Sequence, residues 1–202
     1  MQAPEKPVES AQEASPKSNP WSAADVAAIL CERGWLARGT DRAEMGRSSA
    51  APLLGLSDGH LAWCERAALL LGPQAVDRAA LESLLGLVFH YDAAELAGQV
   101  ESHVVLSRDG ARDVLRETAL LLMDGGVLDS ERFKEIIAAL KVRLERGSRD
   151  LFHPIRLALA GKSGEGELDR VILLLDAAAA LQWDVPVKSA RERMIEFCSA
   201  MD

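Results

Sequence analysis

The sequence predicts an all-α protein, a bundle-like arrangement of two small helical subdomains. Apolar residues make up 49% of the 202 positions and aromatic residues only 4%, with Ala and Leu dominant. That composition favours helices over strands. Apolar residues also recur at helical spacing, and no segment shows the alternation typical of a strand. We expect a disordered tail over residues 1–20, an N-terminal subdomain over 21–106 and a C-terminal subdomain over 107–202.

The N-terminal tail mixes Pro, Glu, Ser and Lys without an apolar stretch. It lacks the pattern of a signal peptide and cannot bury enough surface to offset its chain entropy. Order is predicted to begin at Trp21, because Ser22 and Asp25 have the spacing of a capping box and Gly34 supplies a helix stop. The polar and small residues of 36–52 predict a loop with at most a short helical turn.

Capping side chains mark the other helix starts in the first half of the chain. Ser57 precedes a helix that we expect to end at Gly72–Pro73. Asp77 precedes a second helix with leucines at helical spacing, and Asp92 opens a shorter segment through Leu96.

The second half predicts five further helices. The first runs over about 109–123 and ends at the glycines 125–126. The next starts at Asp129 or Ser130, turns Phe133 and its apolar neighbours inward, and is expected to end at Gly147. Basic residues occupy its other faces.

The last three helices are predicted from proline and glycine positions. Pro154 suits the first turn of a short helix that ends at Gly161. Another helix covers roughly residues 167–182. Pro186 precedes the last one, whose inner side is expected to hold Met194, Ile195 and Cys198.

Charge is distributed unevenly along the chain. The formal net charge is −8, so the chain as a whole is not an electrostatic nucleic-acid binder. Residues 1–129 hold 19 acidic and 11 basic side chains, whereas 132–162 hold eight basic and three acidic ones. This basic strip is either a solvated helix face or a surface that contacts phosphates.

Metal, cofactor and membrane sites are not indicated. The three cysteines and four histidines are scattered, without the clustered spacing that metal ligands need, and no cofactor is expected. Few, separated thiols suit a reducing compartment, and we expect a cytoplasmic protein. No run of about 18 apolar residues predicts a membrane span.

A Gly-Lys-Ser triplet at residues 161–163 raises the question of a phosphate-binding loop. Such a loop needs a glycine five residues before the Gly-Lys pair and a buried strand before it. Arg156 occupies the glycine position, and a helix is predicted in place of the strand. We therefore expect Gly161 to be a helix C-cap, with Lys162 near the negative end of the helix dipole.

The stretch that contains this triplet, DLFHPIRLALAGKSGEGELDRVILLLD, resembles the C-terminal anticodon-binding domain of bacterial glutamyl-tRNA synthetases. That family has a lead of the form K-L-F-x-P-[LI]-R-x-A-L-[TA]-G, a short loop and a leucine-rich helix. The resemblance covers about 80 residues, Arg108 to Gln182. In the lead, the matching positions are Leu151, Phe152, Pro154, Ile155, Arg156, Ala158, Leu159 and Gly161.

The resemblance implies an α-helical, anticodon-binding-domain-like scaffold that contacts tRNA. The family's anticodon-approaching arginine matches Arg156, its loop matches residues 162–167, and the leucine that opens the next helix matches Leu168. Unstacked anticodon bases offer edges and faces to such groups. The tRNA-binding residues expected on this basis are Arg156, Lys162, Glu165, Gly166 and Leu168, with Lys141, Arg143, Arg146 and Arg149 as phosphate contacts.

Two of these residues have a structural alternative. Arg156 can pair with Asp150 or Asp169 and cover the core with its methylenes, a role as well supported as RNA contact. Leu168 begins an apolar stripe, which favours the core over a base contact. The loop also departs from the family, since Gly166 stands where a proline is common and Glu165 adds negative charge.

Three classes of function remain open on the sequence. The family's catalytic motifs, of the His-[IV]-Gly-His and Lys-Met-Ser-Lys-Ser types, are absent, so the first is a non-catalytic tRNA-binding module that acts alone or beside a separate synthetase-like catalytic chain. The second is a helical protein–protein interaction module that lost RNA binding. The third, an enzyme with a new site, is the least supported, because His60, His90, His103 and Glu101 lie on separate segments.

Overall fold

The computed structural model describes residues 19–37 and 55–201, and these residues confirm the all-α prediction. They form ten α-helices and one 3₁₀ helix, with no strand among them. The elements are α1 (Ala23–Glu32), α2 (Asp58–Leu71), η2 (Gly72–Gln74), α3 (Arg78–Phe89), α4 (Ala93–Gly98), α5 (Val100–Leu106), α6 (Ala111–Met123), α7 (Ser130–Leu144), α8 (Ser148–Ala160), α9 (Glu167–Ala179) and α10 (Ala190–Ala200). The predicted tail up to residue 18 and most of the predicted loop, 38–54, lie outside the described residues.

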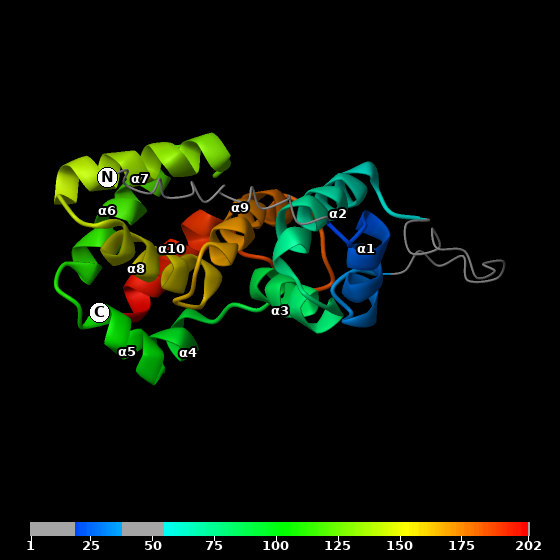
Figure 1. Ribbon diagram of the computed structural model, residues 1–202, viewed down its shortest axis with the longest axis horizontal. Helices are drawn as coiled ribbons and strands as arrows, with labels where there is room; N and C mark the ends of the chain where they lie inside the picture. Colours follow the sequence, from blue (N-terminus) through cyan, green and yellow to red (C-terminus); the bar gives the residue numbers. More distant parts are fainter. Residues whose placement is uncertain (1–18, 38–54, 202) are drawn as a thin grey trace, which may run out of the picture.

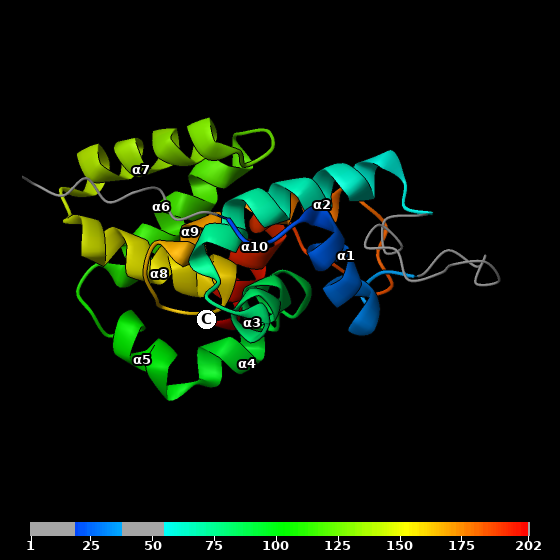
Figure 2. The ribbon, with the colours of Figure 1, turned by 45° about the vertical axis from the view of Figure 1, so that its right-hand side comes forward.

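Two C-terminal helices connect the ends of the molecule. In Figure 1, α1, α2 and α3 lie together at one end and α5, α6, α7 and α8 at the other, with α9 and α10 between them. Helix α9 contacts α2, α3 and α8, while α10 contacts α4, α6 and α8. The same arrangement is visible after the turn to the view of Figure 2. One continuous apolar core therefore crosses the predicted boundary at residues 106 and 107, and the two-subdomain division stays a prediction.

The predicted caps are present where the sequence placed them. Ser22 and Asp25 form a capping box at the start of α1. The side chains of Ser57, Asp77 and Asp92 each accept a hydrogen bond from the backbone N–H three residues ahead, as the predicted starts require. After α1, Gly34 has φ +70° and a Schellman pair of hydrogen bonds closes the helix.

Two predicted positions around α8 are wrong. Helix α7 ends at Leu144 because Glu145, not Gly147, adopts the left-handed conformation, with φ 51°. Gly147 instead caps the start of α8, which begins at Ser148. Pro154 consequently lies in the second turn of α8 and not in the first. Its missing N–H leaves the carbonyl of Asp150 without a helical donor, and Asp150 is exposed, where water can hydrogen-bond that oxygen.

Helix α5 and the outward side of α10 also differ from expectation. The segment Val100–Leu106 forms α5, which the sequence did not indicate because its valines favour strands. In α10, Met194 is buried as predicted, but Ile195 is 42% exposed. The buried position next to Met194 belongs to Arg193, which a hydrophobic pattern cannot identify as a core residue.

Arg193 is fully buried and joins three parts of the fold. Its guanidinium donates hydrogen bonds to the carbonyls of Leu87 and Val88 in the last turn of α3, and to that of Leu159 in the last turn of α8. A fourth bond, 3.3 Å long, reaches the carbonyl of Lys188 before α10. Helix C-termini leave these carbonyls without helical donors and carry partial negative charge, so a cation is favourable there.

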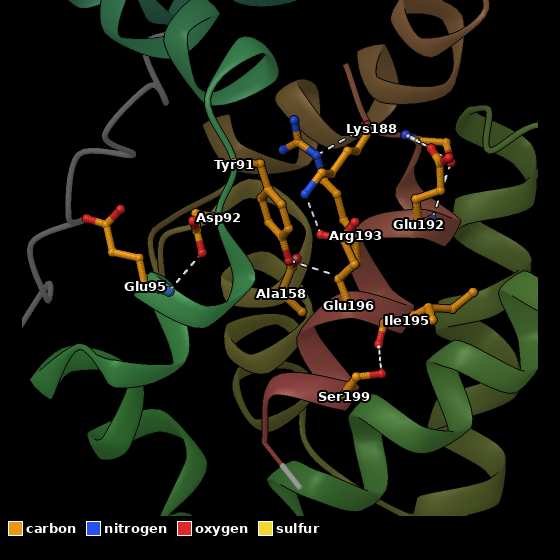
Figure 3. A network of polar contacts seen from close by, with 11 residues as sticks. Tyr91, Asp92, Glu95, Ala158, Lys188, Glu192, Arg193, Ile195, Glu196 and Ser199 are labelled. Carbon is orange, nitrogen blue, oxygen red and sulfur yellow. Dashed lines mark hydrogen bonds and ion pairs between the residues drawn. The ribbon is translucent and has the colours of Figure 1, made fainter. Parts of the chain in front are cut away.

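The ring of Tyr91 lies against Arg193 in the same network (Figure 3). The Arg193 guanidinium carbon is 4.5 Å from the ring centroid. The Tyr91 hydroxyl is 2.6 Å from the carbonyl oxygen of Ala158 in α8, so the tyrosine adds a second tie between α8 and the segment after α3. Burial raises the pKa of Tyr91 and keeps the hydroxyl protonated as a donor.

Candidate nucleic-acid interface

The Gly-Lys-Ser corner ends a helix. Gly161 has φ 76° and ψ 11°, and its N–H donates to the carbonyl of Leu157 at the end of α8. No strand precedes it among the described residues, and an L side chain here would adopt a strained backbone conformation. The predicted C-cap is confirmed, and Lys162 stands exposed directly after the negative end of α8. The geometry that a phosphate-binding loop requires is therefore missing at this corner.

Arg156 lies beneath the loop between α8 and α9 with only 8% of its surface exposed. Its Nε and Nη2 each donate to one carboxylate oxygen of Asp169 at 2.7 Å, and Nη1 donates to the carbonyl of Gly164 at 2.8 Å. The guanidinium carbon is 4.8 Å from the centroid of Phe152. The hydrogen bonds that Arg156 donates to Asp169 raise the pKa of Arg156, so its charge is permanent. The structural alternative, pairing with Asp169, is confirmed, and the side chain fixes the loop to the start of α9.

The loop itself presents polar groups outward. Lys162, Glu165 and Gly166 are exposed, and Gly166 is the N-cap residue of α9. Leu168 is only 3% exposed and belongs to the core, in line with its place at the start of an apolar stripe. The predicted loop residues are thus brought together around a fixed backbone, with Leu168 behind them.

The predicted phosphate-contacting residues do not form a continuous positive strip. Arg143 pairs with Glu117 at 2.8 Å, and Arg146 pairs with Asp109 at the same distance. Lys141 on α7 and Arg149 on α8 are exposed and form no ion pair within the described residues. Half of this set is therefore neutralised by carboxylates, which weakens its field for RNA.

A cationic cluster that the sequence did not single out lies beside α8. Arg108, in the turn between α5 and α6, places its Nη1 2.9 Å from Nδ1 of His153. Partial burial lowers the pKa of His153, and the nearby Arg108, Arg149 and Arg156 lower it further. The spacing of residues 149, 153 and 156 on one helix face was a usable signal for His153. No sequence signal identifies Arg108, because it lies 45 positions away.

An open groove of about 690 Å³ runs beside the corner, and Lys162 stands at its edge. Apolar side chains such as Phe89, Leu96 and Val185 line it, together with the carboxylates of Asp92 and Glu95. Buried Arg193 also lines the groove, but its guanidinium already donates hydrogen bonds to carbonyls in the last turns of α3 and α8.

The described residues offer neither a metal-binding cluster nor a membrane-spanning helix. Across residues 19–37 and 55–201, no three His, Cys, Asp or Glu side chains gather in a group that could hold a metal ion. Within the same residues, none of the helices combines the length and apolarity needed to cross a bilayer.

Comparison with known proteins gives one partial similarity. The chain is 34% identical over 86 residues to the glutamate–tRNA ligase of Carboxydothermus hydrogenoformans. The matched residues are 43% of this chain and 18% of the ligase, so the chain spans about a fifth of the length of this curated relative. No family model matches the chain, and no solved structure matches it. The similarity is distant and partial, and it is to a protein of the family that the sequence around α8 and α9 resembles.

Proposed function

We propose that the chain is a non-catalytic helical module, related to glutamate–tRNA ligase, that binds the anticodon arm of a tRNA. The observation that carries the proposal is the 34% identity over 86 residues to a tRNA ligase. The loop after α8, which Arg156 fixes through the carbonyl of Gly164, supports the proposal, because recognition of unstacked bases requires groups that are fixed in position. The module would act in or beside tRNA aminoacylation, with a separate synthetase-like chain as the source of catalysis.

In this proposal the side chains have different roles. Lys162, Glu165 and the backbone of Gly166 meet the bases, because they form the exposed surface of the loop. Arg156 positions that loop from beneath through Gly164. Lys141 and Arg149 contact phosphates directly. Arg143 and Arg146 contact a phosphate only if each first releases its carboxylate partner, Glu117 or Asp109.

The salt dependence of tRNA binding tests the proposal. Three unpaired cations, Lys141, Arg149 and Lys162, give a slope of log affinity against log salt of about −2, at about −0.7 per phosphate for single strands. A fourfold increase in salt then lowers the affinity roughly 15-fold. Gel shift of an anticodon-arm RNA at two salt concentrations measures this. Absence of binding even at the lower salt concentration would refute RNA binding.

Substitution identifies the surface in the same assay. Arg149→Gln and Lys162→Gln together are expected to lower the magnitude of the salt slope by about 1.4. Arg143→Gln is the matched control, because Arg143 is also exposed but is neutralised by Glu117. Equal losses in the two proteins would mean that the proposed surface is not the one that binds.

A second candidate function is protein–protein interaction, with RNA binding lost. It is favoured by the acid-paired arginines, by the net charge of −8, and by apolar side chains that are exposed on the described surface. Val127 and Val142, at 68% and 80% exposure, are two of these side chains. Affinity capture from a nuclease-treated lysate separates the two functions, because a protein partner stays bound and an RNA-bridged one is lost.

A further inference from the structure

The cationic cluster beside α8 lies apart from the loop between α8 and α9, and it shares only Arg149 with the residues that the proposed function uses. It consists of Arg108 from the turn between α5 and α6, and Arg149 and His153 from α8. Residues 149 and 153 are four positions apart and therefore lie on the same face of the helix. Two separate elements thus bring three basic side chains together.

These side chains have no carboxylate partner within the described residues. Arg108 donates to His153, and neither Arg108 nor Arg149 forms an ion pair there. The nearby carboxylates gather instead around Arg146: Asp109 bonds to it, and the charges of Asp150 and Asp113 act on it more weakly. In the described part of the chain, Arg108, Arg149 and His153 are thus left without a hydrogen-bonded carboxylate, whereas Arg146 holds Asp109.

We propose that Arg108, Arg149 and His153 form a binding site for a phosphate group. Two guanidinium groups supply forked N–H donors, which match phosphate oxygens, and His153, whose Nδ1 accepts from Arg108, supplies its Nε2–H as a third donor. The site goes beyond RNA binding, because either an RNA backbone phosphate or a phosphorylated small molecule carries the required group.

Binding is coupled to proton uptake by His153. The charged groups that act on this ring are Arg108 across from α8, Arg149 and Arg156 along α8, and Glu165 from the loop after it. Desolvation and the three arginines lower the pKa of the free ring, whereas a bound anion offsets the arginine charges and favours proton uptake at Nδ1, with the Arg108 N–H turning from Nδ1 to the anion. Phosphate binding therefore raises the pKa of His153, by about one unit for an anion in contact.

Titration of His153 by NMR tests the site in the full chain. Inorganic phosphate is the first probe, with sodium chloride at matched ionic strength as the control for screening, and His60, His90 and His103 as internal references. The expected result is a rise of about one pKa unit at His153 with phosphate alone. Equal responses to phosphate and chloride would overturn the site. Sulfate keeps a constant charge over the pH range of the His153 titration. It is expected to bind about tenfold more tightly below the pKa of His153 than above it, which is the affinity change that corresponds to a shift of about one pKa unit.

Variants and a second probe separate the outcomes. Arg149→Gln is expected to remove most of the response, and Arg78→Gln, which alters an exposed, acid-paired arginine on α3, is expected to retain it. A single-stranded RNA without terminal phosphates then shows whether a backbone phosphate suffices. If the unaltered chain binds tRNA but His153 shows no response to phosphate, only this site is overturned. A retained response without tRNA binding overturns only the proposed function.

Discussion

Replacement of Arg193 by methionine tests the reasoning that this side chain joins the helices of the fold. Methionine keeps an unbranched apolar stem, but it is shorter than arginine and has no donors for the four carbonyls that Arg193 bonds. Three of these carbonyls, those of Leu87, Val88 and Leu159, lie in the last turns of α3 and α8. The change therefore removes the charge and leaves helix ends unsatisfied in the interior.

The expected loss is about 5 kcal/mol in the free energy of unfolding. Each buried carbonyl without a donor costs about 2 kcal/mol, and four are affected. Burial lowers the pKa of Arg193 from 12.5 to about 10, and relief of this desolvation returns about 3 kcal/mol. The net value agrees with the effect of breaking other buried charged contacts, about 3–5 kcal/mol. It corresponds to a fall in Tm of about 10–20 °C for a chain of this size.

Thermal and denaturant unfolding followed by circular dichroism measure the effect. The matched control is Arg191→Met on the same helix, because Arg191 is exposed and its expected change is about 0.5 kcal/mol or less. If Arg193→Met lowers Tm no more than Arg191→Met does, the helix ends do not depend on this guanidinium and the reasoning is refuted.

Three further predictions concern single positions. Burial raises the pKa of Cys64 to about 12, so we expect iodoacetamide at pH 8 to modify this thiol only in denaturant; modification of the native protein at the denatured rate would contradict its burial. Gly161→Ala places a methyl group on a residue with φ 76° and is expected to lower the free energy of unfolding in urea by about 1 kcal/mol. Gly166→Ala, at φ −64° and with open space around the new methyl group, is expected to be nearly neutral, and equal losses in the two proteins would exclude backbone strain at Gly161. Ser189→Ala is expected to cost about 1 kcal/mol at neutral pH. The backbone N–H and the hydroxyl of Ser189 both donate to Glu192 and lower its pKa, and Ser189→Ala removes only the hydroxyl's share. That share is present above pH 4.5 and is lost as the pH falls through the lowered value, so a difference between the two proteins that does not shrink at low pH would contradict the hydroxyl bond to Glu192.

Helix positions were predictable because they depend on local chemistry. Ser57 and Asp77 accept bonds from N–H groups three residues ahead, so the sequence spacing alone determines the start of the helix. The end of α7 was not predictable in this way, because Glu145 adopts the left-handed conformation although Gly147 lies two residues further on. Helix ends depend on how the next element packs, and a nearby glycine is only one of the solutions.

The site was less predictable because its contacts join distant residues. Arg156 and Asp169 are 13 positions apart, and the sequence offered Asp150 as an equal partner. Only the turn at Gly161 and the direction of α9 bring Asp169 to the guanidinium. The pairing of Arg108 with His153 depends in the same way on the packing of α5 against α8.

The burial of Arg156 changes how the corner would read RNA. An arginine that contacts a base edge needs its forked donors free, but three of the donors of Arg156 already bond to Asp169 and Gly164. A base would have to displace a bidentate carboxylate, and such charge-assisted pairs are the strong ones. Sequence discrimination, if the chain binds RNA, therefore falls to Lys162, Glu165 and the backbone of the loop. With so few unpaired cations nearby, we expect weak affinity for an isolated RNA, and a larger gain in binding if a partner chain holds the same tRNA and raises its local concentration.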